Sequence, residues 1–153
     1  MIAISIRKAD PLSADGRRLL TASQNYLRSL YPPEDNYFLP IEALAADPAI
    51  TFLMAYDDTG ALGCVALADK GEYGEVKSLW VDPNTRGKSV GAALMETLEG
   101  RARARKLKML KLETGDTLHA AHRLYKRVGY TICGPFGDYA EGPHSVFMEK
   151  TLS

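Results

Sequence analysis

The stretch Glu75–Leu94, "EVKSLWVDPNTRGKSVGAAL", separates two patterns of secondary structure. Residues 75–81 predict a strand, and a loop then leads into a long helix at about 89–106. The apolar residues on one side of that helix are Val90, Ala93, Leu94, Leu98 and Ala102. The segments before this stretch predict strands joined by short turns, whereas the segments after it alternate strands and helices.

The N-terminal half predicts a strand at "IAISIR" (2–7), a helix at 12–31 capped by Ser13, and a short helix after Pro40. A hairpin follows, because two apolar runs flank Asp57-Asp58-Thr59-Gly60. The later segments are a strand at 109–114, a helix at 118–128 and strands near 130–133 and 145–152. Alternating strands and helices are typical of parallel pairing. We therefore expect a mixed α/β (α+β) fold: a central sheet of about six to seven strands, antiparallel early and partly parallel later, flanked by about four helices.

The composition predicts one globular domain, residues 1–153, because 46% of the chain is hydrophobic and 25% is charged. Lys plus Arg equals Asp plus Glu at 19 each, so no net charge favours nucleic acid or an anionic membrane. We find no signal peptide, no membrane-length apolar run and no metal-type spacing around the two cysteines. The expectation is a cytoplasmic protein that binds no metal, no nucleic acid and no membrane.

The tripeptide Gly87-Lys88-Ser89 matches the end of a Walker A phosphate loop. That motif needs a glycine five positions before Gly87, where this chain has Asp82, whose carboxylate would repel phosphates. A nucleoside-triphosphate site is therefore disfavoured. The loop still suits an anion, since Arg86 and Lys88 add positive charge and a helix begins after them. The alternative is an ordinary strand–helix turn with solvated basic residues.

Two blocks carry a family resemblance. The segment 75–114, "EVKSLWVDPNTRGKSVGAALMETLEGRARARKLKMLKLET", resembles the acetyl-CoA-binding core of the GNAT acetyltransferases. Its Arg86 and Gly91 match the ends of the family's [RQ]-x-x-G-x-[GA] loop, and Ser89 stands at the central glycine. The segment 121–130, "AHRLYKRVGY", is similar to the family's A-x-x-L-Y-x-x-x-G-[FY] helix and turn, although Leu118 replaces a frequent asparagine.

The resemblance implies that acetyl-CoA is the cosubstrate and that the strand and loop around Val81 bind it. The residues expected to bind the coenzyme are Leu79, Trp80, Val81, Arg86, Gly87, Lys88, Ser89, Val90, Gly91 and Ala92. A main-chain N–H near Val81 would stabilise the oxyanion of the reacting thioester.

The resemblance also implies two catalytic residues. Tyr125 matches the tyrosine that donates a proton to the coenzyme thiolate; the alternative is a core tyrosine. Glu75 stands where some members carry the general base; the alternative is a strand-end glutamate in water or paired with Lys77. Glu113, at the end of the "KLET" strand, is a rival to Glu75.

The acceptor site is expected between loops, with Tyr139, Glu141 and His144 as substrate-binding residues and "YPPEDNYFLP" (31–40) as the opposite wall. The implied reaction is direct acetyl transfer to a primary amine of a small metabolite. A protein amine is the second choice of acceptor. Ser89 and Leu118 favour a different alternative, a coenzyme-binding sensor or partner-binding module with reduced catalysis. Analogy with the family also allows a homodimer.

Overall fold

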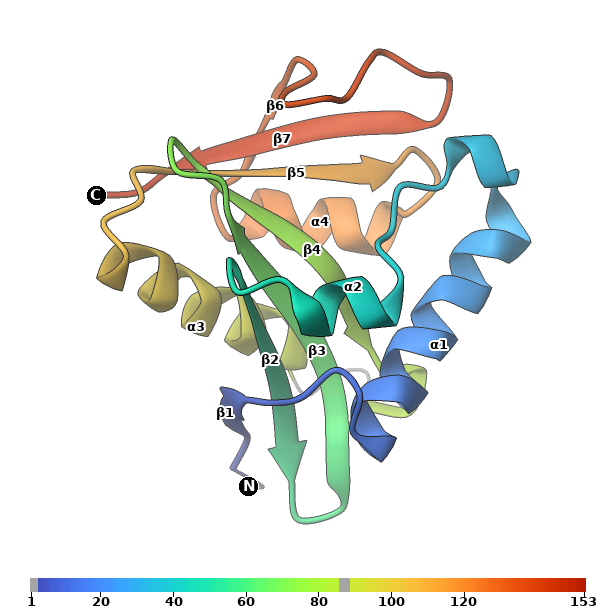
Figure 1. The fold of residues 1–153 in the computed structure, drawn as a ribbon, viewed down its shortest axis with the longest axis vertical. Coiled ribbons are helices and arrows are strands. Elements are labelled where there is room, and N and C mark those ends of the chain that lie inside the picture. The colour runs from blue at the N-terminus through green and yellow to red at the C-terminus, as the bar shows by residue number, and fades with distance from the viewer. Residues whose placement is uncertain (1–2, 86–88) are drawn as a thin grey trace.

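The computed structural model describes residues 3–85 and 89–153. In this part of the chain, seven strands form one sheet in the order β1-β2-β3-β4-β5-β7-β6, and helices lie on both faces (Figure 1). The strands are β1 (Ser5–Lys8), β2 (Ile50–Asp57), β3 (Gly60–Asp69), β4 (Gly74–Val81), β5 (Met109–Gly115), β6 (Thr131–Cys133) and β7 (Ser145–Thr151). The helices are α1 (Ala14–Leu30), α2 (Ile41–Ala46), α3 (Val90–Ala104) and α4 (His119–Arg127). The expected mixed α/β fold is confirmed.

The N-terminal half follows its local sequence signals. The Ser13 hydroxyl accepts a hydrogen bond from the Gly16 N–H at 3.1 Å, as an N-cap does at the start of α1. Asp57 accepts from the Thr59 N–H at 2.8 Å inside the turn between β2 and β3, and Gly60 has a φ of 126° that favours glycine. Strands β1 to β4 therefore form an antiparallel meander, as expected.

Both faces of β2 and β3 are buried, which explains their nearly continuous apolar sequences. Leu53 and Val65 face a core made with α3 and α4, around Leu94 and Leu98. The alternate residues of the same strands face a second core made with α1 and α2, which contains Leu19, Leu20, Leu44, Phe52 and Met54. This two-layer burial fixes the sheet as a rigid platform between helices.

The sheet changes direction between β4 and β5. These two strands run parallel and pair only at Gly74 with Leu110 and at Glu75 with Lys111. Beyond these two pairs they separate, and α3 connects them behind the sheet (Figure 1). The parallel unit expected from the strand–helix–strand pattern is thus present as β4–α3–β5, with an opening between its strands.

The strands after β5 add no second parallel pair within the described residues. The short strand β6 pairs antiparallel with β7, and β7 lies between β5 and β6. Along the whole of β5, from Met109 opposite Thr151 to Gly115 opposite Ser145, β7 supplies the antiparallel partner. Because β6 offers only the three residues Thr131–Cys133, the longer β7 takes the position beside β5.

Two further findings concern the sequence expectations. No helix within the described ranges is long and apolar enough to cross a membrane. Both cysteines are free: Cys64 is buried as expected, whereas Cys133 on β6 is only partly buried.

Candidate active site

A bulge in β4 sets the geometry of the site. Cys64 pairs with Trp80 and Ala66 pairs with Lys77, so β4 has one extra residue opposite β3. Ser78 takes up this residue with a φ of 58°, in the left-handed region that non-glycine residues rarely adopt. The Cys64 thiol donates to the Ser78 carbonyl at 3.4 Å. The bulge re-aims the last part of the strand.

The bulge also decides which peptide groups face the opening. The Asp82 N–H donates to the Leu62 carbonyl at 2.8 Å, so the peptide groups of Trp80 and Asp82 point toward β3. Peptide groups alternate along a strand, and the Val81 N–H therefore points away from β3. That side of β4 pairs with β5 only as far as Glu75. The Val81 N–H consequently faces the open edge.

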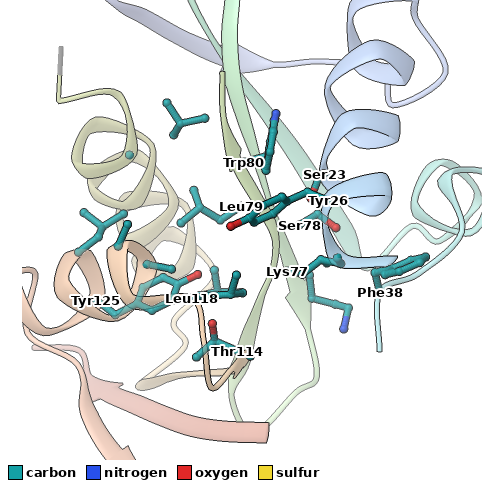
Figure 2. A pocket seen from close by; sticks show the side chains of 18 of the residues that line it. Ser23, Tyr26, Phe38, Lys77, Ser78, Leu79, Trp80, Thr114, Leu118 and Tyr125 are labelled. Atoms are coloured by element: carbon teal, nitrogen blue, oxygen red, sulfur yellow. The ribbon is translucent and has the colours of Figure 1, made fainter. Parts of the chain in front are cut away.

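A cavity of about 810 Å³ occupies the opening between β4 and β5. One wall is the C-terminal part of α1 together with residues 35–38, and the other is α4 with the start of α3. Figure 2 shows Tyr26, Phe38 and Lys77 on the first side and Leu118, Thr114 and Tyr125 on the second. A cleft of this size between two rigid elements suits a cosubstrate and a small second substrate.

Most of the residues expected to bind the coenzyme line this cavity. They are Leu79, Trp80, Val81, Ser89, Val90, Gly91 and Ala92. Arg86, Gly87 and Lys88 lie outside the described residues. Ser89 is the N-cap of α3 with φ 57° and ψ 31°, and its side chain makes no capping hydrogen bond. The serine thus occupies the left-handed conformation that glycine would adopt at no steric cost.

Tyr125 projects from α4 into the cavity, where Figure 2 shows its hydroxyl group pointing inward. The residue is 7% exposed. Burial raises the pKa of its hydroxyl, and the negative charge of Glu113 raises it further. The hydroxyl therefore stays protonated near neutral pH and is available as a proton donor.

Glu75 lies at the base of the opening and is paired. Its Oε2 accepts from Lys77 Nζ at 3.2 Å and from the Tyr139 hydroxyl at 2.5 Å, and Lys77 also donates to Tyr139 at 3.0 Å. The side chains of Glu75 and Lys77 are only 6% and 11% exposed. Burial and the adjacent Glu75 carboxylate raise the pKa of Tyr139, which keeps its hydroxyl a donor. The ion pair that we considered for Glu75 is thus present and buried.

Glu113 lines the same cavity from the end of β5. Its Oε2 accepts from the Ser145 hydroxyl at 2.9 Å. Burial is the main cause that raises the pKa of Glu113, and Glu75 adds to it, whereas Ser145 and Lys77 lower it. A carboxyl group with a raised pKa in a cleft is suited to proton transfer.

The three residues expected to bind the acceptor do not line the cavity. The Tyr139 hydroxyl bonds to Glu75, and Glu141 is exposed. His144 Nδ1 lies 3.3 Å from Asp116, and the His144 ring packs on Tyr31. The wall opposite α4 is formed by α1 and residues 35–38. The sequence analysis included "YPPEDNYFLP" but not the α1 residues Ser23, Gln24 and Tyr26, which also line the cavity. The helical spacing of Tyr26 predicts core packing, and Ser23 and Gln24 belong to no motif.

No group of three or more His, Cys, Asp or Glu side chains within residues 3–85 and 89–153 could hold a metal ion.

Comparison with known proteins agrees with this geometry. The profile of the Acetyltransferase (GNAT) family matches residues 16–130. The chain is 40% identical over 151 residues to the IAA acetyltransferase of Azospirillum brasilense, covering 97% of this chain and 98% of that protein. It is 34% identical to the uncharacterized N-acetyltransferase YsnE of Bacillus subtilis, covering 95% and 98%. A solved structure from Klebsiella pneumoniae, assigned as an acyl-CoA N-acyltransferase, shares 34% identity and a TM-score of 0.82 over 98% of both chains.

The chain belongs to the acetyltransferase (GNAT) family. It is an acetyltransferase, and the family supports acetyl transfer that depends on an acyl-CoA.

Proposed function

We propose that the protein transfers an acetyl group from acetyl-CoA directly to a primary amine of a small molecule, and that residues 1–153 act as one acetyltransferase domain. The observation that carries this proposal is the opening between β4 and β5, into which the bulge at Ser78 turns the Val81 N–H. A thioester carbonyl beside this N–H would gain a hydrogen bond as its oxygen becomes negative. Ser89 to Ala92, at the start of α3, would contact the coenzyme phosphates, which a helix N-terminus favours.

Tyr125 is the proposed acid. When the carbon–sulfur bond breaks, the thiolate of the coenzyme takes the Tyr125 proton, and the amide nitrogen returns a proton to the phenolate. The hydroxyl is protonated at neutral pH, since a tyrosine titrates near pH 10 and burial raises the pKa of Tyr125 further.

Direct transfer is supported by the state of the cysteines. Burial raises the pKa of the Cys64 thiol to about 12, and its Sγ is engaged with the Ser78 carbonyl. Burial also raises the pKa of Cys133, which does not line the cavity. A thiol with a raised pKa is a poor nucleophile at neutral pH. An acetyl-cysteine intermediate is therefore disfavoured.

A small acceptor is supported by the wall that closes the other side of the cavity. Tyr26, Tyr37, Phe38 and Trp80 give this side an aromatic surface, and the rings of Tyr26 and Trp80 lie 5.7 Å apart. Such faces attract an ammonium group and apolar carbon. The relative from Azospirillum brasilense is named as an acetyltransferase of IAA; we carry over acetyl transfer alone. A protein amine is the second candidate acceptor.

The experiment that tests this function is calorimetric titration with acetyl-CoA, with ATP–Mg as the comparison ligand. We expect micromolar binding of acetyl-CoA and no binding of ATP–Mg, because Asp82 stands where a triphosphate loop needs glycine. Binding of ATP–Mg alone would overturn the proposal. Binding of acetyl-CoA without transfer to any amine would favour the sensor with reduced catalysis.

A further inference from the structure

Two carboxyl groups, Glu75 on β4 and Glu113 on β5, line the cavity at the point where these strands separate. An amine that attacks a thioester must first lose a proton, so one of the two is a candidate proton acceptor. Their surroundings differ, and the difference separates their roles.

Glu75 is held by two donors. Lys77 and Tyr139 both bond to its Oε2, and Lys77 also bonds to Tyr139, so the three side chains form a closed triangle. The ring of Tyr139 is packed in turn against Phe136 and Phe147. Both donors to Oε2 of Glu75 are therefore already in place, and the triangle fixes β4 to the loop before β7.

Glu113 has different partners. The neutral hydroxyl of Ser145 is its hydrogen-bond donor, and within the described residues no cation forms an ion pair with it. Ser145 begins β7, opposite Gly115 on β5, so strand pairing holds this donor in place. The side chain is half-buried and lines the cavity, where it lies close enough to Tyr125 for its charge to raise the pKa of that hydroxyl. Glu113 and Tyr125, the proposed acid, therefore line the same cavity.

We propose that Glu113, oriented by Ser145, is the base that accepts the proton of the acceptor amine, and that Glu75, Lys77 and Tyr139 form a positioning network. This inference rests on the acetyl transfer proposed above, and it replaces Glu75 by Glu113 as the base.

The ammonium group of the acceptor gives one proton to the Glu113 carboxylate, and the freed nitrogen lone pair forms the carbon–nitrogen bond with the thioester carbon. The carbon–sulfur bond breaks, the sulfur takes a proton from Tyr125, and the nitrogen gives its second proton to the Tyr125 oxygen. Glu113 then releases its proton to water. The products are the amide, free coenzyme A and one proton.

The charged and titratable groups around Glu113 come from four elements. Glu75 and Lys77 face it from β4, Tyr125 from α4, and Tyr139 from the loop before β7; Ser145 of β7 donates the hydrogen bond. Burial and Glu75 together raise the pKa of Glu113. In the plot of kcat against pH, the fall of kcat on the acidic side is the acid limb. Its midpoint should lie above the pH at which an ordinary glutamate titrates. Activity requires the ionised base, so kcat falls as the pH drops through this midpoint.

The test measures kcat against pH with acetyl-CoA and the best acceptor among phenethylamine, tyramine, spermidine and lysine. Glu113→Gln should lower kcat by about 10²–10⁴-fold and remove the acid limb. Ser145→Ala should move the limb to higher pH, because the lost hydrogen bond stabilised the charged carboxylate. Ser145→Thr, which keeps the hydroxyl, should restore the wild-type midpoint. Glu96→Gln, at an exposed position on α3, is the matched control and should leave kcat and the limb unchanged.

Carbon-13 NMR titration of the glutamate side chains gives a readout without turnover, and the Glu113 signal should follow the same shift in Ser145→Ala. The assignment is overturned if Glu113→Gln keeps the acid limb, or if Glu75→Gln removes it while Glu113→Gln does not. Failure of the proposed function has a different signature, since the wild-type protein would then release no coenzyme A with any of the four amines.

Discussion

Ser89 holds a left-handed backbone conformation at the start of α3, with φ 57° and ψ 31°. Family resemblance places glycine at this position, and the sequence therefore indicated a conflict between side chain and backbone angle. The structure resolves it by keeping the glycine-like angle with a serine. A side chain in this region costs roughly 1–2 kcal/mol, and Ser89 gains no capping hydrogen bond in return.

Ser89→Gly should stabilise the fold. Relief of roughly 1–2 kcal/mol of strain exceeds the roughly 0.5–1 kcal/mol that glycine adds to the entropy of the unfolded chain. The expected gain in the free energy of unfolding is roughly 0.5–1 kcal/mol, measured by urea denaturation. Ser13→Gly is the matched control, because Ser13 caps α1 with a φ of −63° and should lose roughly a few tenths of a kcal/mol. A loss of stability in Ser89→Gly would contradict this account of the loop.

Tyr125→Phe should lower kcat by about 10²–10⁴-fold if its hydroxyl is the acid. The ring and its packing stay, so the free energy of unfolding should change little. Tyr130→Phe is the control: its ring packs 5.8 Å from that of Tyr125, but its buried hydroxyl has no partner in the described part of the chain. We expect that variant to keep kcat and to gain roughly 1 kcal/mol of stability. Unchanged turnover in Tyr125→Phe would remove the proposed acid.

The residues of the site were predictable to different degrees. The family resemblance of residues 75–114 implied a place at the site for Leu79, Trp80 and Val81, and they line the cavity. The pairing of Glu75 with Tyr139 could not, because the two residues are 64 positions apart and no local pattern encodes their contact. This long-range bond holds Tyr139 on Glu75, and Tyr139 does not line the cavity.

At the scale of elements, β4 combines a bulge with a buried ion pair. The bulge at Ser78 changes which side of the strand its later peptide groups face. The pair of Glu75 and Lys77 lies just before the bulge and contacts the loop before β7 through Tyr139. On the side that faces β5, β4 is therefore held at its Glu75 end, while its Val81 end stays open to a ligand.

Lys77→Met should destabilise the protein by about 3–5 kcal/mol, because it leaves the carboxylate of Glu75 buried without its cation. The double variant Glu75→Gln with Lys77→Met should recover most of this loss. A double-mutant cycle of unfolding free energies measures the coupling. Losses that simply add would show that the two side chains do not form one unit.

The order of elements along the chain was predictable, but one pairing was not. Periodicity and capping located α1, the hairpin of β2 and β3, and the strand–loop–helix of β4 and α3. The insertion of β7 between β5 and β6 depends on which strand gains the longer antiparallel ladder. That competition involves the residues 109–115 and 145–151, which lie far apart in sequence.

The opening between β4 and β5 interrupts the pairing of these two strands, and side-chain contacts link the elements around it. Lys150 on β7 donates to Glu99 on α3 at 2.7 Å and to the Val128 carbonyl at the end of α4 at 2.6 Å. One ammonium group thus links β7, α3 and the end of α4. These contacts hold α3 and α4, which form one wall of the cavity, against β7.

Lys150→Met should lower the free energy of unfolding by about 2 kcal/mol, since Glu99 is 10% exposed and Lys150 23% exposed, between a surface pair and a fully buried pair. Arg103→Met is the control. Arg103 contacts the same carboxylate at 3.8 Å from a more exposed position, and its loss should cost less than about 1 kcal/mol. Equal effects of the two variants in chemical denaturation would show that the Lys150 contacts do not link the elements.

Direct transfer is tested by the initial rate of coenzyme A release, measured over a grid of acetyl-CoA and amine concentrations. The double-reciprocal lines should intersect, because acetyl-CoA and amine must occupy the cavity between β4 and β5 together for direct transfer. Parallel lines would indicate a covalent acetyl-enzyme intermediate and would contradict direct transfer at this site.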